Sequence, residues 1–476
     1  MQPSLTAKQK KIESIAILRG IAMVIMALDH VRNYFHITKQ ITIMKNIIAP
    51  LLLLVSFATF SQTTNTTKEI KVNQQRIESR IFELAKFGKD SLGRGYRVAY
   101  TKGDVAGRTW FIGLMKKAEL DVSIDAAGNL IGKRKGKNPL LKPIAFGSHI
   151  DMVPDGGNYD GCVGSVCGLE IMEILKENNI VTNHPLELII FSDEEGSLLG
   201  SKALAGKFKQ EGLQTVSQSG LTVKEGTKAI GGNPDSINNI IRKKGDIETF
   251  IELHIEQGGI LEKENIQIGV VEGIVGIEDW EVTVEGFANH AGTTPMNMRQ
   301  DALLSAAKLI IGVNEVITSH EGKQVGTVGK ISAQPGAYNV VPGKVVLGLE
   351  IRDLSYDKIW ELFHEIEKRA AVIAVAGGTK ITFKNQLLGA IPALTNKSIQ
   401  EKIVASAKAL GFTYKYMQSG AGHDSQDMAL ITPVGMIFVP SVGGISHSPK
   451  EFTKAIDMAN GANVLLQTIL AIDKEQ

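Results

Sequence analysis

Short apolar runs alternate with amphipathic stretches over most of this chain from about residue 70. Residues 143–147, 186–192 and 249–254 are almost continuously apolar, which is typical of central parallel strands covered on both faces. Residues 162–178 have the apolar spacing of a helix. Strands that alternate with helices predict an α/β sheet with helices on both faces. In such sheets, chemistry takes place at the carboxyl ends of the strands.

One region interrupts this rhythm with a compact pattern of its own. Its elements are predicted in the order β-α-β-β-α-β, which is the split βαβ arrangement. We expect strands at 280–286, 325–333, 344–351 and 379–384, and helices at 299–320 and 356–376. Such a unit between two parts of a larger sheet indicates an inserted domain. The predicted domains are a first catalytic part (70–275), the inserted domain (276–386) and a second catalytic part (387–476).

The chain before residue 70 differs in character from the rest. Met44-Lys45-Asn46 opens a basic segment, residues 47–60 are apolar, and small residues follow near Ala58. This is the pattern of a secretory signal peptide at 44–62, and the apolar run is too short to favour a spanning helix. The expected location is periplasmic or secreted, with a cytoplasmic location as the alternative.

A signal peptide belongs at a terminus, yet residues 1–43 precede it. We interpret these residues as an extraneous segment that arose from a gene fusion or a start-site error. Residues 12–36 resemble the opening of multi-pass membrane acyltransferases, but only one partial helix of such a protein is present. The alternative is a true amphipathic leader that tethers the protein to a membrane.

Composition narrows the classes of partner. The 476 residues are 43% hydrophobic and 21% charged, with a formal net charge of +2, so nothing favours a nucleic-acid partner. A cysteine-rich zinc site is excluded because Cys162 and Cys167 are the only cysteines. They lie five residues apart in one predicted helix, where a disulfide is geometrically unfavourable, and we interpret them as buried thiols.

Chemistry-bearing side chains follow the predicted strands. His149 and Asp151 follow the first apolar run, and Asp193-Glu194-Glu195 closes the second. Three consecutive carboxylates at such a position are electrostatically costly unless cations compensate them. One carboxylate of the three can bind a metal while its neighbour takes a proton from water.

Further candidate ligands complete the pattern. His254 follows the third apolar run, Asp160 lies in Asn-Tyr-Asp-Gly, and His447 lies in Ile-Ser-His-Ser-Pro. Imidazoles and carboxylates are the ligands that zinc and manganese accept, and one carboxylate can bridge two ions ~3.5–4 Å apart. Taken alone, His149 would read as a surface histidine and Asp160 as a turn aspartate. Their conjunction with the carboxylate run favours a metal site.

Six motifs in order carry a family resemblance that covers roughly 70–474. The chain resembles the M20 metallopeptidase family, and within it the hydantoinase/carbamoylase branch of N-carbamoyl-L-amino acid hydrolases, allantoate amidohydrolases and β-ureidopropionases. The motifs are Gly-Ser-His149-Ile-Asp151, Tyr-Asp160-Gly, Asp-Glu194-Glu195-Gly, Glu-Leu-His254-Ile-Glu-Gln257-Gly, Asn289-His290-Ala-Gly-Thr-Thr-Pro295-Met and Ile-Ser-His447-Ser-Pro.

The resemblance implies a bilobal, zinc-peptidase-like α/β fold with an inserted dimerisation or lid domain, and a homodimer formed through that domain. It implies two divalent metal ions per subunit: zinc, or manganese, cobalt or nickel. Glu194 would be the general base, and Asp151 would orient His149. The implied metal ligands are His149, Asp160, Glu195, His254 and His447, with Asp160 bridging the two ions.

Substrate contacts are implied in the same way. Gln257 would contact the ureido or amide group, and His290, often of the partner subunit, would stabilise the developing oxyanion. Asn339 and Arg352 would together hold a substrate carboxylate, for which the planar guanidinium is suited. The alternatives are a loop histidine that caps backbone groups for His290 and an exposed salt bridge for Arg352.

The glycine-rich stretch Ser419-Gly-Ala-Gly422-His423-Asp424 has no phosphate-loop lysine, so nucleotide binding is not supported. The resemblance implies instead that Gly422 and His423 belong to a backbone loop over the substrate.

We therefore expect a dinuclear metal-dependent amidohydrolase that cleaves a linear C–N bond of N-carbamoyl amino acids. The alternatives within the family are allantoate amidohydrolase and an aminoacylase or dipeptidase. From other classes, a metal-stabilised binding protein and a membrane acyltransferase are the rivals. Intact Glu194 and His290 argue against the binding protein, and the missing spans argue against the acyltransferase.

Overall fold

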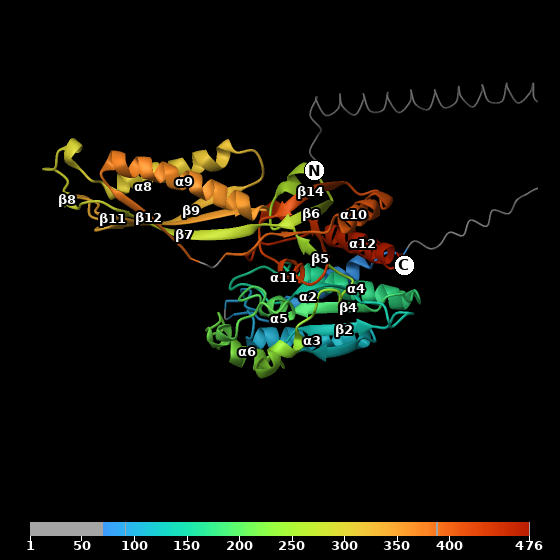
Figure 1. The fold of residues 1–476 in the computed structure, drawn as a ribbon. Helices are drawn as coiled ribbons and strands as arrows, with labels where there is room; N and C mark the ends of the chain where they lie inside the picture. The colour runs from blue at the N-terminus through green and yellow to red at the C-terminus, as the bar shows by residue number, and fades with distance from the viewer. Residues whose placement is uncertain (1–69, 91, 387–388, 476) are drawn as a thin grey trace, which may run out of the picture. The chain divides into compact units, whose positions relative to one another are not determined.

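The computed structural model describes residues 70–475 except 91, 387 and 388 (Figure 1). The predicted signal peptide at 44–62 and the segment 1–43 lie outside the described residues.

A nine-stranded sheet forms the centre of the larger part of the molecule. Its order is β1-β2-β4-β3-β5-β15-β6-β13, and β14 pairs with β6. The central strands β3, β4, β5 and β15 are parallel to their neighbours in this group. The strands are β1 (Asp121–Ile124), β2 (Leu130–Arg134), β3 (Ile144–His149), β4 (Leu186–Phe191), β5 (Thr249–Ile255), β6 (Ile268–Ile274), β13 (Ala393–Leu394), β14 (Tyr414–Ser419) and β15 (Val434–Val439).

Every residue of these four central strands is buried, as their continuous apolar runs predict. Successive residues serve opposite faces: Phe146 packs into one hydrophobic cluster and Ala145 into another. Helices α2 (Gln74–Leu84), α4 (Cys162–Glu177), α10 (Lys397–Ala409) and α12 (Ala455–Ile472) cover the first face, and α5 (Leu199–Leu204) and α11 (Asp424–Met428) cover the second. The predicted α/β class with helices on both faces is confirmed.

The remaining helices of this part are short or peripheral. They are α3 (Lys102–Lys117), α6 (Val223–Ala229) and α7 (Ile260–Glu264), with 3-10 turns η1 (Gln210–Gln214), η2 (Pro234–Ile240) and η4 (Val442–Gly444). Cys162 and Cys167 are both buried in α4 as free thiols.

A four-stranded antiparallel sheet with its own hydrophobic core lies between β6 and β13 in the chain. Its order is β12-β7-β11-β9, and α8 and α9 pack on one face (Figure 1). Burial alternates along β7 and β11, which is the pattern of a sheet covered on one side. The elements are β7 (Gly276–Glu285), α8 (Ala302–Ser319), β9 (Val325–Gln334), β11 (Lys344–Asp353), α9 (Tyr356–Gly377) and β12 (Lys380–Asn385).

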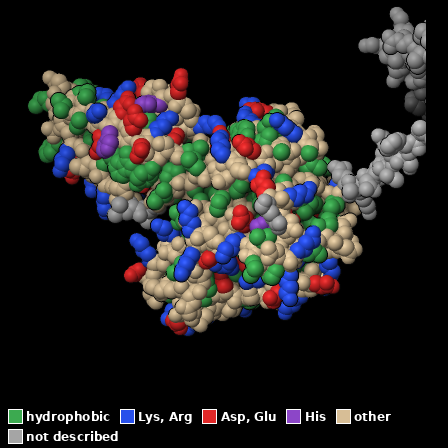
Figure 2. Space-filling model, turned by 45° about the vertical axis from the view of Figure 1, so that its right-hand side comes forward, with side chains coloured by type: hydrophobic (Ala, Val, Ile, Leu, Met, Phe, Trp, Pro, Cys, Tyr) green, Lys and Arg blue, Asp and Glu red, His purple; other side chains and the backbone are tan. Residues whose placement is uncertain are grey.

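A small two-stranded pair lies beyond the end of this sheet. It consists of β8 (Asn289–His290) and β10 (Val340–Val341), near the 3-10 turn η3 (Met296–Met298). On the face seen in Figure 2, acidic and basic side chains are interspersed over both parts of the molecule.

By length and composition alone, two of the described helices could cross a membrane, α8 and α12. Most of α12 is buried against α4, α10 and β15, as in the core helix of a globular fold. Fewer than half of the residues of α8 are buried, so this helix keeps an apolar outer face.

Candidate active site

The predicted ligands converge at the carboxyl ends of the central strands. His149 is the last residue of β3, and His254 lies one residue before the end of β5. Glu194 and Glu195 follow β4 in a tight turn. Because β3, β4 and β5 are parallel, their carboxyl ends meet at one edge of the sheet.

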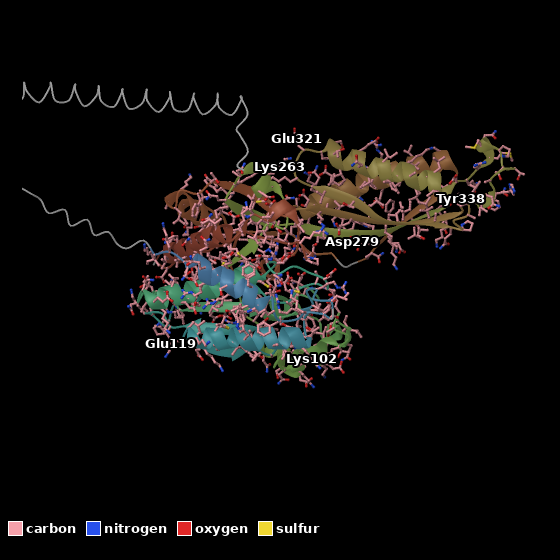
Figure 3. The ribbon with its side chains drawn as sticks, turned by 180° about the vertical axis from the view of Figure 1, so that it is seen from behind. Lys102, Glu119, Lys263, Asp279, Glu321 and Tyr338 are labelled. Carbon is pink, nitrogen blue, oxygen red and sulfur yellow. The ribbon has the colours of Figure 1, made fainter. Side chains whose placement is uncertain are left out.

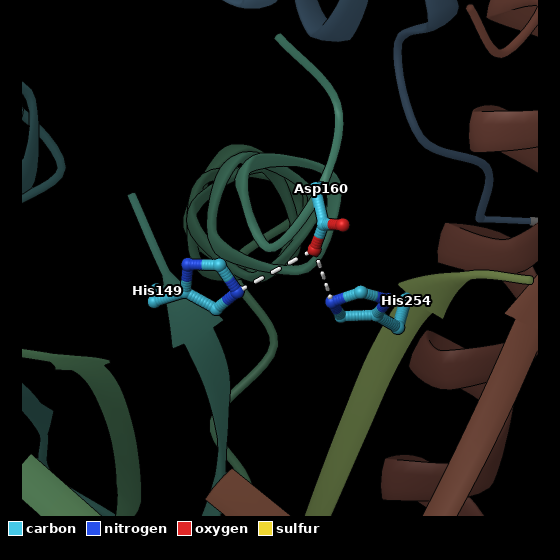
Figure 4. Close-up of side chains that lie close together, drawn as sticks. All are labelled: His149, Asp160 and His254. Carbon is cyan, nitrogen blue, oxygen red and sulfur yellow. Dashed lines mark ion pairs between the residues drawn. The ribbon is translucent and has the colours of Figure 1, made fainter. Parts of the chain in front are cut away.

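Asp160 holds the first group of side chains together. Its Oδ1 lies 3.6 Å from Nε2 of His149 and 3.1 Å from Nε2 of His254 (Figure 4). All three side chains are buried, and they are close enough to share one metal ion. We call His149, Asp160 and His254 the first trio.

The hydrogen bonds of the two imidazoles fix which nitrogen carries the lone pair. Nδ1 of His149 lies 3.1 Å from the carbonyl oxygen of Asp151, and Nδ1 of His254 lies 2.9 Å from that of Ile255. A carbonyl can only accept, so each Nδ1 donates and the lone pair of the neutral ring is on Nε2. Both lone pairs therefore point toward the Asp160 carboxylate, an arrangement that a cation stabilises.

A second trio shares the same aspartate. Nε2 of His447 lies 3.4 Å from Oδ2 of Asp160 and 3.4 Å from Oε2 of Glu195. These three side chains also meet the distance requirement for one ion. Oε1 of Glu195 is buried with no hydrogen-bond partner, so this oxygen has unused capacity for a cation. Asp160 thus offers one oxygen to each trio, as a bridging ligand would.

A third grouping, Glu252, His254 and His423, also has short mutual distances but is not an independent site. The Glu252 carboxylate already accepts hydrogen bonds from the hydroxyl groups of Ser148 and Ser425 at 2.8 and 2.7 Å. Nε2 of His254 lies 3.1 Å from Oδ1 of Asp160 and accepts the backbone N–H of Gly161 at 3.1 Å, so it has no further lone pair for this grouping. The donor chemistry therefore fits two cations.

The electrostatics agree with an excess of carboxylates in this site. Burial raises the pKa of Glu194 well above its ordinary value and raises that of Glu195 to about 7, with neighbouring carboxylates adding to the shift. Burial would lower the pKa of His149, but Glu194 and Asp160 outweigh it and raise that pKa. Without cations, protons must offset the negative charge.

Glu194 is placed for proton transfer rather than for ligation. Its Oε2 lies 3.4 Å from Nε2 of His149, and it belongs to neither trio. A buried carboxylate beside the ligands, with an elevated pKa, can take a proton from water and release it again.

Asp151 makes contact with His149 differently from the expectation. Its carboxylate is 3.8 Å from Nδ1 of His149, whereas its main-chain carbonyl lies at 3.1 Å. The carboxylate instead accepts the backbone N–H of Glu195 at 3.1 Å. The backbone of Asp151 orients the imidazole, and its side chain fixes the turn that carries Glu195.

Gln257 and the glycine-rich loop lie beside the trios. Gln257 donates through Nε2 to Oδ2 of Asp160 at 2.6 Å, and its Oε1 is buried without a partner. Nε2 of His423 lies 2.7 Å from the Ser419 hydroxyl, and its ring stacks edge-on against His254. A Cβ added at Gly422, next to it, would lie 3.5 Å from Oε1 of Gln426, which is an ordinary van der Waals contact.

Arg352 is engaged in a salt bridge. Its guanidinium forms two hydrogen bonds to Glu350, at 2.7 and 2.9 Å, and donates to the carbonyl of Gly420 at 2.6 Å. This is the salt-bridge alternative, although the contact with Gly420 places Arg352 against the loop that carries His423.

His290 and Asn339 lie at the opposite end of the four-stranded sheet from Arg352. In the antiparallel register, Lys344 at the start of β11 pairs with the end of β7, and Arg352 pairs with its beginning. Eight residues of strand span about 26 Å. Figure 3 shows Tyr338, the neighbour of Asn339, at the far tip. Asn339 and Arg352 of one chain are therefore too far apart to hold the same carboxylate, and they could do so together only from two chains.

The His290 side chain bonds within its own loop. Its Nδ1 accepts the backbone N–H groups of Gly292 and Thr293 at 3.0 and 3.2 Å, which is the backbone-capping alternative. This leaves the proton on Nε2 of an exposed ring. The histidine is thus a ready donor, but for a group outside its own loop.

Four residues near the trios were missed by sequence reasoning: the buried carboxylates Glu252, Asp424 and Glu451, and the half-buried Ser446. Both carboxylate oxygens of Asp424 are buried without a hydrogen-bond partner. Glu451 lies in Ser-Pro-Lys-Glu, which reads as an exposed turn. The one available signal was its position four residues after His447.

An α/β sheet whose strand ends carry paired imidazole–carboxylate groups and a separate buried glutamate is the arrangement of a hydrolytic site. The model for peptidase family M20/M25/M40 matches residues 145–471, and the chain belongs to this family. The prediction of an M20 hydrolase is confirmed.

Individual relatives are similar over nearly their whole length. The N-carbamoyl-L-amino-acid amidohydrolase of Paenarthrobacter aurescens is 39% identical over 410 residues, covering 85% of this chain and 99% of the relative. The ureidoglycolate hydrolase of Arabidopsis thaliana is 38% identical over 417 residues, covering 85% and 88%. The crystal structure of a hydantoinase/carbamoylase family amidase from Burkholderia multivorans matches with a TM-score of 0.80 at 33% identity. The match covers 85% of this chain and 99% of the amidase. The resemblance to the carbamoylase branch is thereby confirmed.

Proposed function

We propose that this protein is a dinuclear metal-dependent amidohydrolase that hydrolyses N-carbamoyl amino acids to the amino acid, carbon dioxide and ammonia. The observation that carries the proposal is the pair of donor trios sharing Asp160, with Glu194 beside them. The similarity to N-carbamoyl-L-amino-acid amidohydrolases supports the choice of substrate class.

In this proposal the first trio holds one divalent cation and the second trio holds the other. When bound, the cations would act as Lewis acids toward the attacking water and the substrate carbonyl. Zinc suits the mixture of imidazole and carboxylate ligands, and manganese, cobalt and nickel are the alternatives.

Glu194 acts as the base and then as the acid. It accepts a proton from the attacking water as the water oxygen bonds to the carbamoyl carbon. It then delivers that proton to the leaving nitrogen of the amino acid as the C–N bond breaks. Its burial and elevated pKa suit both halves of this exchange.

Three groups of the same chain recognise the substrate in this proposal. The unpartnered Oε1 of Gln257 accepts a ureido N–H. Arg352 binds the carboxylate by exchanging its bidentate partner Glu350 for the substrate. The loop with Gly422 and His423 closes over the substrate.

In this proposal, the groups that stabilise the oxyanion and contact the far side of the substrate come from a second copy of this chain. His290 and Asn339 lie about one strand length from Arg352, so we propose that they enter the site of a homodimer partner. Strand β9 is an edge of the four-stranded sheet, and Ile331 on it is 54% exposed. On α8, Ile311 is 60% exposed. A free edge beside an apolar helix face suits pairing with an identical unit.

Ammonia release tests the proposal directly. The full chain, loaded with zinc, manganese or cobalt, is assayed against N-carbamoyl amino acids, ureidoglycolate and allantoate. N-acetyl amino acids and dipeptides are followed in parallel by amine release. Ammonia from an N-carbamoyl amino acid that depends on Glu194 is the expected result.

Other outcomes reassign the protein. Ammonia from allantoate or ureidoglycolate alone would show that the substrate is a different ureido compound. Amine release from acyl substrates or dipeptides alone would place the protein with the peptidases of the family. Inactivity on every substrate with metal bound would favour a binding protein.

A further inference from the structure

A buried glutamate outside both trios ties together two distant segments of the site. Glu451 is 4% exposed and lies in the loop between β15 and α12. Its Oε1 accepts the backbone N–H of Tyr159 at 2.7 Å and that of Asp160 at 3.0 Å. It therefore anchors the main chain that carries the aspartate shared by the two trios.

The other carboxylate oxygen of Glu451 is linked to the side chain of Asp160 through the hydroxyl of Ser446. Oε2 lies 2.9 Å from the hydroxyl of Ser446, and that hydroxyl lies 2.7 Å from Oδ2 of Asp160. Ser446 directly precedes His447 of the second trio. The contacts close a ring through the backbone and carboxylate of Asp160, Ser446 and Glu451.

The backbone at Gly157 passes close to the Glu451 carboxylate. A Cβ added to Gly157 would lie 2.2 Å from Oε1 of Glu451, so the turn backbone passes against the carboxylate. A close approach of this kind requires glycine at position 157.

We propose that Glu451 is a positioning residue that sets the Asp160 carboxylate between the two trios and thereby determines whether the second cation is held. The inference rests on the proposed function, because it takes the trios to be cation sites. It concerns Glu451 and Ser446, to which the proposed mechanism gives no part.

The two trios depend on this ring to different degrees. The histidines of the first trio belong to buried strands β3 and β5. His447 of the second trio lies in a loop, its side chain is 50% exposed, and its φ is +52°. Loss of Glu451 should therefore weaken the second site far more than the first.

The test measures metal content in the full chain. Zinc per chain is determined by mass spectrometry after gel filtration, and cobalt binding is followed by its visible absorption. We expect two ions in the unaltered protein and one in Glu451→Ala. In titrations, affinity for the second ion should fall by about 10–100-fold, the usual effect of removing a group that orients a ligand.

Conservative variants separate positioning from charge. Glu451→Gln keeps an amide oxygen that can accept both backbone N–H groups, so it should retain two ions. Ser446→Ala removes one hydroxyl without disturbing the backbone anchor, so it should fold and still weaken the second site. This variant keeps the proposal testable if Glu451→Ala does not fold.

The chain offers a matched control in Asp473, which is 7% exposed. Its carboxylate accepts the backbone N–H groups of Asn183 and His184 at 3.0 and 2.8 Å, again across about 290 residues of chain. Asp473→Ala should lower thermal stability and leave both ions bound.

Two failures are distinguishable. Two ions of unchanged affinity in Glu451→Ala and Ser446→Ala would overturn the positioning role and leave the proposed function intact. Fewer than two ions in the unaltered protein would overturn the dinuclear function itself, and the inference with it.

Discussion

The two sheets of this molecule use opposite solutions to burial. The central strands of the nine-stranded sheet are buried along their whole length, and helices cover both faces. The four-stranded sheet is covered on one face, and its strand β9 is exposed along most of its length. The first sheet therefore presents functional groups only at strand ends, whereas the second presents a face, an edge and a tip.

This difference explains why the first sheet assembles a site within one chain and the second does not. Parallel strands bring residues from three distant segments to one edge, where Asp160 joins them. The antiparallel strands of the second sheet send Arg352 to one end and His290 to the other. In the proposed homodimer, the contribution of the second sheet to the site would be complete only when two chains meet.

The largest expected effect is on the first sheet alone. Glu194→Gln keeps the size of the side chain but cannot accept a proton. We expect kcat to fall about a thousandfold, within the usual range for loss of a general base. Steady-state kinetics measure this, and metal content provides the control, because Glu194 belongs to neither trio. A kcat within tenfold of the original would contradict the assigned role.

The next prediction joins the two sheets. His290→Ala should lose activity about a hundredfold or more, as expected for removal of an oxyanion donor. Mixing it with Glu194→Gln under conditions that exchange subunits should restore activity. Each mixed dimer has one site with both residues intact, so random exchange returns about one quarter of the original activity.

The control for this mixture is a doubly substituted chain, Glu194→Gln with His290→Ala, mixed with either single variant. No mixed dimer of that kind contains an intact site, so activity should stay at the level of the single variants. No restoration in the first mixture, once subunit exchange has been shown, would contradict a site built from two chains.

The fold was largely predictable because its signals are local. Continuous apolar runs predicted β3, β4 and β5, and the observed end of β4 (Leu186–Phe191) differs from the predicted run 186–192 by one residue. The trios could be predicted because each ligand follows such a run or lies in a short motif. Strand ends meet in a parallel sheet whatever the details of the loops.

The remaining features depend on pairing between distant segments. Apart from its position four residues after His447, no local pattern marks Glu451, because its backbone partners Tyr159 and Asp160 lie almost 300 residues earlier. The separation of Arg352 from Asn339 follows from antiparallel register, which neighbours in sequence do not reveal. The main-chain carbonyl of Asp151 lies closer to Nδ1 of His149 than the Asp151 carboxylate does, because the backbone turns there. Hydrophobic periodicity does not indicate such a turn.

Metal removal should separate the stabilities of the two regions. An ion at a concentration 100 times its Kd adds about 2.7 kcal/mol to stability, and that contribution belongs to the sheet that binds it. Chelation should speed hydrogen exchange in β3 and β5 and leave β7 and β11 unchanged, because the second sheet has its own core. Equal acceleration in both would show that the two regions unfold as one unit.

The last prediction concerns stability alone and a buried acid beside the first sheet. Burial raises the pKa of Asp104 to about 6. The ordinary pKa of an aspartate is lower, so as the pH rises this group ionises in the unfolded chain before it ionises in the folded protein. The free energy of unfolding therefore falls by roughly 3 kcal/mol between about pH 4 and 6.

Asp104→Asn removes that titration and keeps an oxygen for the backbone N–H of Tyr100. We expect the variant to match the original at pH 4 and to be more stable at pH 8, as measured by urea unfolding in chelated protein. A constant difference at both pH values would contradict the burial of a titrating acid.

The single carboxylate of Asp160 has a consequence for how affinities in this site are defined. In the proposed dinuclear site, its two oxygens serve different trios, so whichever ion arrives first would both orient the shared ligand and add positive charge near the other position. Thermodynamic linkage makes this coupling reciprocal: the factor by which one ion changes the affinity of the other is the same in both directions. A dissociation constant measured for either position therefore describes the pair, and a metal buffer that fills one position resets the other.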